Sequence, residues 1–126
     1  MGPMLNPVHL VLGDDEFLTE RATKDIIAAA GPAAEVSTLR GAEATEAAIA
    51  MAASPSLFAE DRVVVVEKTE LAGKDAVEAL LKACVDVAPG VTLIVQHTGG
   101  GRQKAMVGKF QKIAEVHSAS IQDKDR

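Results

Sequence analysis

Three carboxylates stand side by side near the start of the chain, directly after a short apolar run. Asp14, Asp15 and Glu16 follow Val8–Leu12 and Gly13. A turn that holds a nucleotide phosphate needs several glycines, a lysine and a hydroxyl, because backbone N–H groups and a cation must surround the phosphate. This turn instead has one glycine, no lysine and three acids, which would repel a triphosphate. The sequence therefore predicts that no nucleotide binds here.

The same acids are compatible with a metal-binding alternative, a response-regulator-like receiver domain. In that domain an acidic pair after the first strand binds Mg²⁺ beside a phosphorylated aspartate, and Asp14, Asp15 and Thr98 stand at the corresponding places. The third predicted strand ends in Glu67, however, so the phosphate-accepting aspartate is missing. The simpler interpretation is that the acids cap the next helix by accepting its free N–H groups.

The other polar residues form no complete catalytic or metal-binding set. His9, His97 and His117 fall in or at the ends of separate predicted strands, without an acid or cysteine at ligand spacing, and are interpreted as polar strand residues. Gly99–Gly101 is interpreted as a turn rather than a phosphate cradle. Cys84, on an apolar helix face, is expected in the core. We therefore predict no catalytic residue, no cofactor and no metal.

Two bulky apolar residues, Leu57 and Phe58, lie just before the four consecutive valines Val63–Val66. Pro55 and the charged residues 60–62 flank them. They could project from a turn as a two-pronged hydrophobic plug, because paired anchors that enter a pocket concentrate the energy of a small interface. They could instead fold beneath the sheet, and the pattern alone favours this interpretation, since Leu and Phe are usually buried.

Alternating strands and helices must position these residues. Apolar and β-branched runs predict strands at Val8–Leu12, Glu35–Leu39, Val63–Val66, Val91–Gln96 and Ala114–Ser118, the second weakly hydrophobic as in an edge strand. Apolar spacings of three and four predict helices at Glu16–Ala30, Glu43–Ala53, Lys74–Ala88 and Gln103–Ile113. Phe17 and Met51 are expected on the buried faces of their helices. Strands that alternate with helices through short connections predict an α/β fold with three layers and a five-stranded parallel sheet.

Composition favours a single domain that spans residues 1–126. The chain has a net charge of −5, which argues against a general nucleic-acid binder. No stretch approaches the roughly 18 apolar residues of a membrane span, and no secretory signal is visible at the N-terminus. A single cysteine excludes an internal disulfide. We expect a cytoplasmic domain, and the polar tail 121–126 suggests a piece of a longer chain.

One segment resembles a known family. Ser56–Glu67 (SLFAEDRVVVVE) is similar to the part of the bacterial DNA polymerase III delta subunit that grips the sliding clamp. The opening His9–Leu18 resembles the start of delta, a strand followed by a glycine, acids and a bulky pair. Leu93–His117 resembles the fourth strand and the next helix of delta. The whole chain therefore resembles the N-terminal, clamp-binding domain of delta, a clamp-loader subunit.

The resemblance implies an AAA+-like (RecA-like) P-loop NTPase fold without a functional P-loop. It implies that the domain binds the beta sliding clamp and helps open the ring for loading onto DNA. Leu57 and Phe58 would enter the hydrophobic pocket of the clamp, Ser56 belongs to the same segment, and Arg62 would help hold it. Pro55 departs from the hydrophobic residue that often precedes Ser-Leu-Phe.

The resemblance also implies partners beyond the clamp. The other clamp-loader subunits, delta prime and gamma/tau, would be contacted through lid and collar domains expected outside this chain. DNA would be contacted only by the assembled complex, and no membrane is implied. No catalysis is expected of this domain itself, although the holoenzyme that contains delta is a DNA-directed DNA polymerase.

Overall fold

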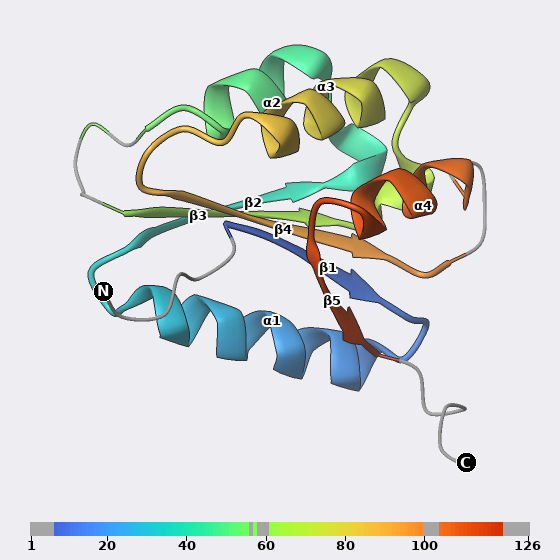
Figure 1. The fold of residues 1–126 in the computed structure, drawn as a ribbon, viewed down its shortest axis with the longest axis horizontal. Helices are drawn as coiled ribbons and strands as arrows, with labels where there is room; N and C mark the ends of the chain where they lie inside the picture. Colours follow the sequence, from blue (N-terminus) through green and yellow to red (C-terminus); the bar gives the residue numbers. More distant parts are fainter. Residues whose placement is uncertain (1–6, 56, 58–60, 100–103, 120–126) are drawn as a thin grey trace.

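The computed structural model describes residues 7–55, 57, 61–99 and 104–119. Its five strands form one parallel sheet in the order β2-β3-β4-β1-β5 (Figure 1). The strands are β1 (Val8–Leu12), β2 (Glu35–Arg40), β3 (Arg62–Glu67), β4 (Val91–His97) and β5 (Glu115–Ser118). The predicted weak strand, β2, lies at one edge, as expected, and β5 lies at the other.

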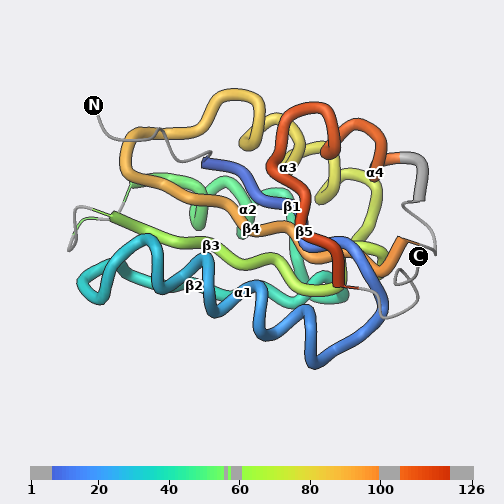
Figure 2. Tube along the Cα trace, turned by 60° about the horizontal axis from the view of Figure 1, so that its bottom comes forward, coloured from blue at the N-terminus to red at the C-terminus, as the bar shows by residue number. Residues whose placement is uncertain are grey.

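Helices cover both faces of the sheet. Helix α1 (Glu16–Ala30) is the one described helix on one face, as Figure 1 and Figure 2 both show. The other face is covered by α2 (Glu46–Ala52), α3 (Lys74–Val85) and α4 (Lys104–Gln111). Two short 3₁₀ turns, η1 (Gly41–Glu43) and η2 (Thr69–Leu71), follow β2 and β3. The predicted three-layer α/β fold is therefore confirmed.

The core consists of two apolar clusters that the sheet separates. Successive side chains of a strand point to opposite faces, so the four valines of β3 divide between the clusters. Val64 and Val66 pack on the face of α2, α3 and α4, whereas Val63 and Val65 pack on the face of α1 together with Ile26. All four valines are buried, which confirms the prediction of a strand covered on both faces.

Helix α1 begins and ends where the sequence predicts. Asp15 is its N-cap, and one carboxylate oxygen accepts a hydrogen bond from the Leu18 amide at 2.8 Å. At the other end Gly31 adopts φ 104°, a conformation that favours glycine, and its N–H donates to the Ala28 carbonyl. The capping interpretation of the acidic turn is therefore confirmed for Asp15.

The prediction that Met51 and Phe17 are buried is wrong. Met51 is 74% exposed, because α2 begins only after the Thr45 cap and turns Ile49 and Ala52 toward the core. Phe17 is 69% exposed, because its neighbour Leu18 instead packs against the apolar cluster on the α1 face of the sheet. The predicted helix at 43–53 is thus shorter than expected, and η1 occupies residues 41–43 before it.

Candidate functional site

The segment between α2 and β3 holds the apolar pair that the sequence distinguishes. We call residues 53–61 the α2–β3 loop. Leu57 is 92% exposed, so the interpretation that buries it beneath the sheet is wrong. The predicted binding residues Ser56 and Phe58 lie outside the described residues. A leucine with nearly its whole side chain in water gains free energy from any apolar pocket that covers it.

Arg62, the first residue of β3, fastens the start of this loop. Its Nη1 donates to the Ser54 carbonyl at 3.0 Å and to the Met51 carbonyl at 3.4 Å. Its Nη2 donates to the Ser37 hydroxyl on β2 at 3.3 Å. Among the described residues, no partner accepts from its buried Nε. The guanidinium therefore ties the last turn of α2 and the first residues of the loop to the edge of the sheet.

The same loop start is ordered by local hydrogen bonds. The Ser54 amide donates to the Met51 carbonyl at 3.3 Å, and the Ser54 hydroxyl donates to the Ala50 carbonyl at 3.0 Å. The Met51 side chain, on the last turn of α2, is exposed. The loop therefore leaves a helix end that also presents an apolar side chain to solvent.

The carboxyl ends of the strands form a separate, acidic cavity of about 570 Å³. Ligands of open parallel sheets usually bind at this end. The charged residues that line it are Asp14, Glu16, Glu20, Lys24, Glu67, Lys68 and Glu70. Lys68 Nζ lies 3.8 Å from a Glu16 carboxylate oxygen, and both side chains are exposed. The excess of acids gives the cavity a lining that repels phosphate, as the sequence indicates for the turn after β1.

The strand order rules out the receiver alternative. A receiver domain has the flavodoxin-like order 2-1-3-4-5, in which β1 lies between β2 and β3. Here β1 lies between β4 and β5 (Figure 1). In addition, Asp15 is engaged as a helix cap, and neither Asp14 nor Asp15 joins a metal-ligand group among the described residues. The receiver interpretation of the acidic pair is therefore wrong.

The structure brings together three residues that the sequence treated as isolated. His9 on β1 lies beside Glu115 and His117 on β5, so the statement that no acid accompanies the histidines is wrong. The signal was present: Glu115 and His117 alternate along one strand and must share a face. The contact with His9 depends on β1 and β5 being neighbours, which no local pattern reveals. His97, the third histidine, is not part of this group.

No protein-family model matches the sequence, and no curated protein sequence does. The structure is similar to that of the Bacillus subtilis DNA clamp loader delta protein, with a TM-score of 0.69 and 20% identity over 92% of this chain. The chain therefore shares the fold of the matching part of this protein. A DNA polymerase III gamma subunit-related protein from Thermotoga maritima is also similar, with a TM-score of 0.65 and 15% identity over 90% of the chain.

The match covers only part of each of these two proteins. This chain spans 39% of the Bacillus subtilis protein and 41% of the Thermotoga maritima protein. The likeness therefore concerns only part of a larger chain in each case. In the described part of this chain, no helix is both long and apolar enough to cross a membrane.

Proposed function

We propose that this chain is the clamp-binding domain of a delta-like clamp-loader subunit that acts in DNA replication. Leu57 and Phe58 enter a hydrophobic pocket of the beta sliding clamp, and the domain helps open the ring. The observation that carries this proposal is the exposure of Leu57, 92% of whose side chain lies in solvent on a loop fastened by Arg62.

Two further observations support this function. The chain shares its fold with a clamp loader delta protein, and the segment that resembles the clamp-gripping part of delta begins on the α2–β3 loop and continues through β3. The cavity at the carboxyl ends of the strands is acidic and has no P-loop beside it, which suits a domain that binds a protein rather than hydrolysing a nucleotide. Delta prime and gamma/tau are further proposed partners, through domains outside this chain, and we propose a cytoplasmic location.

The proposal predicts a large loss of affinity when the apolar pair is removed. Burying a Leu or Phe side chain contributes about 1.5–3 kcal/mol each. The double variant Leu57→Ala, Phe58→Ala should therefore bind a purified bacterial sliding clamp about two to four decades more weakly than the wild type. Isothermal titration calorimetry with both proteins measures this difference directly.

A matched control separates the plug from a general loss of apolar surface. Leu71, in η2 at the opposite end of β3, is 46% exposed. Leu71→Ala should leave clamp affinity unchanged, because the α2–β3 loop lies at the other end of that strand. Equal clamp affinity for the wild type and the double variant, or no binding by the wild type, contradicts the proposed function.

A further inference from the structure

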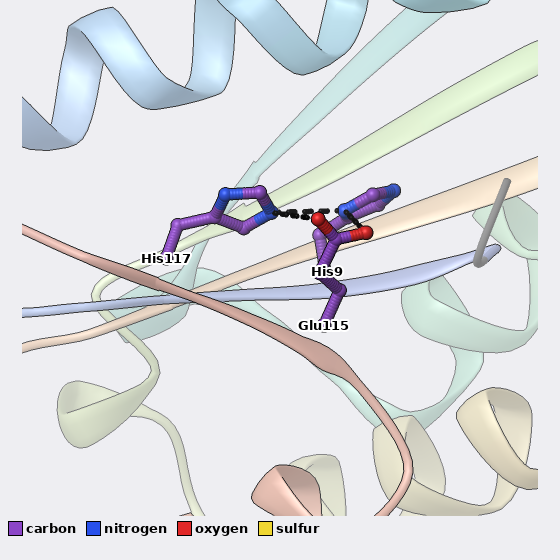
Figure 3. A group of neighbouring side chains, drawn as sticks. All are labelled: His9, Glu115 and His117. Atoms are coloured by element: carbon purple, nitrogen blue, oxygen red, sulfur yellow. Dashed lines mark hydrogen bonds and ion pairs between the residues drawn. The ribbon is translucent and has the colours of Figure 1, made fainter.

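Two histidines and a glutamate converge on the α1 face of the sheet (Figure 3). In the parallel register of β1 and β5, His9 is paired with Glu115, and Val11 is paired with His117. Residues 115 and 117 share a face because they alternate along β5. Three potential metal ligands from two hydrogen-bonded strands therefore point toward one another.

The distances between their polar atoms approach those between the ligands of one small cation. His9 Nδ1 lies 3.1 Å from His117 Nε2 and 3.8 Å from a Glu115 oxygen, and the second Glu115 oxygen lies 4.0 Å from His117 Nε2. Zinc–nitrogen bonds of about 2.0–2.1 Å in a tetrahedral site place ligand atoms roughly 3.3 Å apart. Each residue offers one ligand atom within 4.8 Å of the others, so side-chain shifts of about an ångström would bring all three residues to bonding distance of one ion.

The surroundings of the cluster favour a cation. The three residues line a cavity of about 580 Å³ between the sheet and α1, together with Asp25 of α1 and Asp61. No lysine or arginine is among the described residues that line this cavity. His9 is buried, whereas the side chains of His117 and Glu115 are 26% and 55% exposed. An ion could thus enter from solvent and keep one coordination position open.

We propose that His9 Nδ1, His117 Nε2 and the Glu115 carboxylate bind a divalent transition-metal ion of the zinc class. Two imidazole nitrogens and one carboxylate suit Zn²⁺, Co²⁺, Ni²⁺ or Cu²⁺, whereas Mg²⁺ and Ca²⁺ prefer oxygen ligands alone. The ion would connect β5, the edge strand, to β1, and would stabilise the folded chain by binding only when the two strands are paired. The proposal does not rest on clamp binding, because none of the three ligand residues belongs to the α2–β3 loop.

The direct test is a zinc titration of the chain by isothermal titration calorimetry. We expect saturable binding of one ion per chain. Glu115→Gln and His117→Gln should each weaken binding about tenfold or more, since even outer-shell partners of a metal site contribute 10–100-fold. Glu115 is half exposed, so its variant should fold normally. Glu78→Gln, on α3 at the opposite face of the sheet, is the matched control and should bind zinc like the wild type.

A second measurement identifies the ligand atoms. Long-range proton–nitrogen NMR spectra of the imidazole rings should show zinc-induced shifts of His9 Nδ1 and His117 Nε2, while the ring of His97 stays unchanged. A metal-free pair joined by one N–H···N hydrogen bond would instead show no saturable zinc binding. That result overturns the proposal, and so does wild-type affinity in both cluster variants. An excess of Mg²⁺ that displaced zinc would also overturn it.

Discussion

Cys84 illustrates how burial controls the chemistry of a single side chain. It lies on the inner face of α3 and is only 4% exposed. Burial raises the pKa of the Cys84 thiol from its ordinary value of 9.0 to about 12, because the charged thiolate loses its hydration. At neutral pH the residue is therefore an inert apolar group in the folded chain, as the sequence indicates.

This pKa shift predicts that the chain loses stability in alkali. The stabilising contribution is fully present below pH 9.0 and declines as the pH rises toward about 12, because the unfolded thiol loses its proton first. By about pH 10.5 the free energy of unfolding should fall by about 2 kcal/mol through this residue. Urea unfolding measures the change, followed by far-UV circular dichroism since the chain has no Trp or Tyr.

Cys84→Ala is the control for that experiment. The variant lacks the thiol, so its free energy of unfolding should fall less than that of the wild type between about pH 8 and about pH 10.5. Parallel declines in the two proteins would show that Cys84 ionises as readily in the folded chain as in the unfolded one.

At the scale of elements, Arg62 joins α2, β2 and β3 through one guanidinium. Removing it leaves the Ser54 carbonyl and the Ser37 hydroxyl without this donor. Arg62→Ala should therefore lower the free energy of unfolding by about 1–3 kcal/mol. It should also speed protease cleavage between Met51 and residue 62, because the loop start is no longer tied to the sheet. Urea unfolding and limited proteolysis test the two effects.

Arg62→Lys is the informative companion to this substitution. Lysine keeps the charge but not the planar fork that reaches two elements at once. It should give an intermediate stability and an intermediate cleavage rate. If Arg62→Ala unfolds and is cleaved like the wild type, the hydrogen bonds of Arg62 contribute nothing to the order of the loop.

Gly41 allows η1 to approach the turn that follows β3. A Cβ atom at this position would overlap the backbone carbonyl oxygen of Lys68, which cannot move aside as a side chain can. Gly41→Ala should therefore lower the free energy of unfolding by about 1–3 kcal/mol.

Gly108, in α4, is the contrasting position, where an added Cβ meets nothing within 4 Å. Because alanine is the better helix former, Gly108→Ala should raise the free energy of unfolding by about 0.5–1 kcal/mol. Both substitutions replace glycine with alanine, yet urea unfolding should show changes in the free energy of unfolding that are opposite in sign. A gain in stability for both would show that the close approach at Gly41 is absent in solution.

At the scale of the whole molecule, local patterns predicted the elements but not their neighbours. Four valines in a row and the Asp15 cap identify β3 and α1, because burial on both faces and capping leave local traces. The order of the strands in the sheet leaves no local trace in the sequence. The strand order could therefore not be used against the receiver alternative before β1 was placed between β4 and β5.

The two candidate sites differ, for the same reason, in how far the sequence could predict them. The α2–β3 loop is a continuous segment, and its resemblance to delta could be recognised in the sequence. The exposure of Leu57 could not, because an apolar pair before a buried strand is equally compatible with the core. The group of His9, Glu115 and His117 was missed because its members meet only through the pairing of β1 with β5.

The pairing of β1 also constrains how the chain acquires its structure during synthesis. This strand is translated before the other described elements, yet its partners are residues 93–97 and 115–118. Contacts between such distant segments form slowly, since a long loop must close before they are made. The apolar VHLVL segment therefore stays unpaired until most of the domain has been translated. During that interval we expect a chaperone to bind it, because its apolar side chains are exposed.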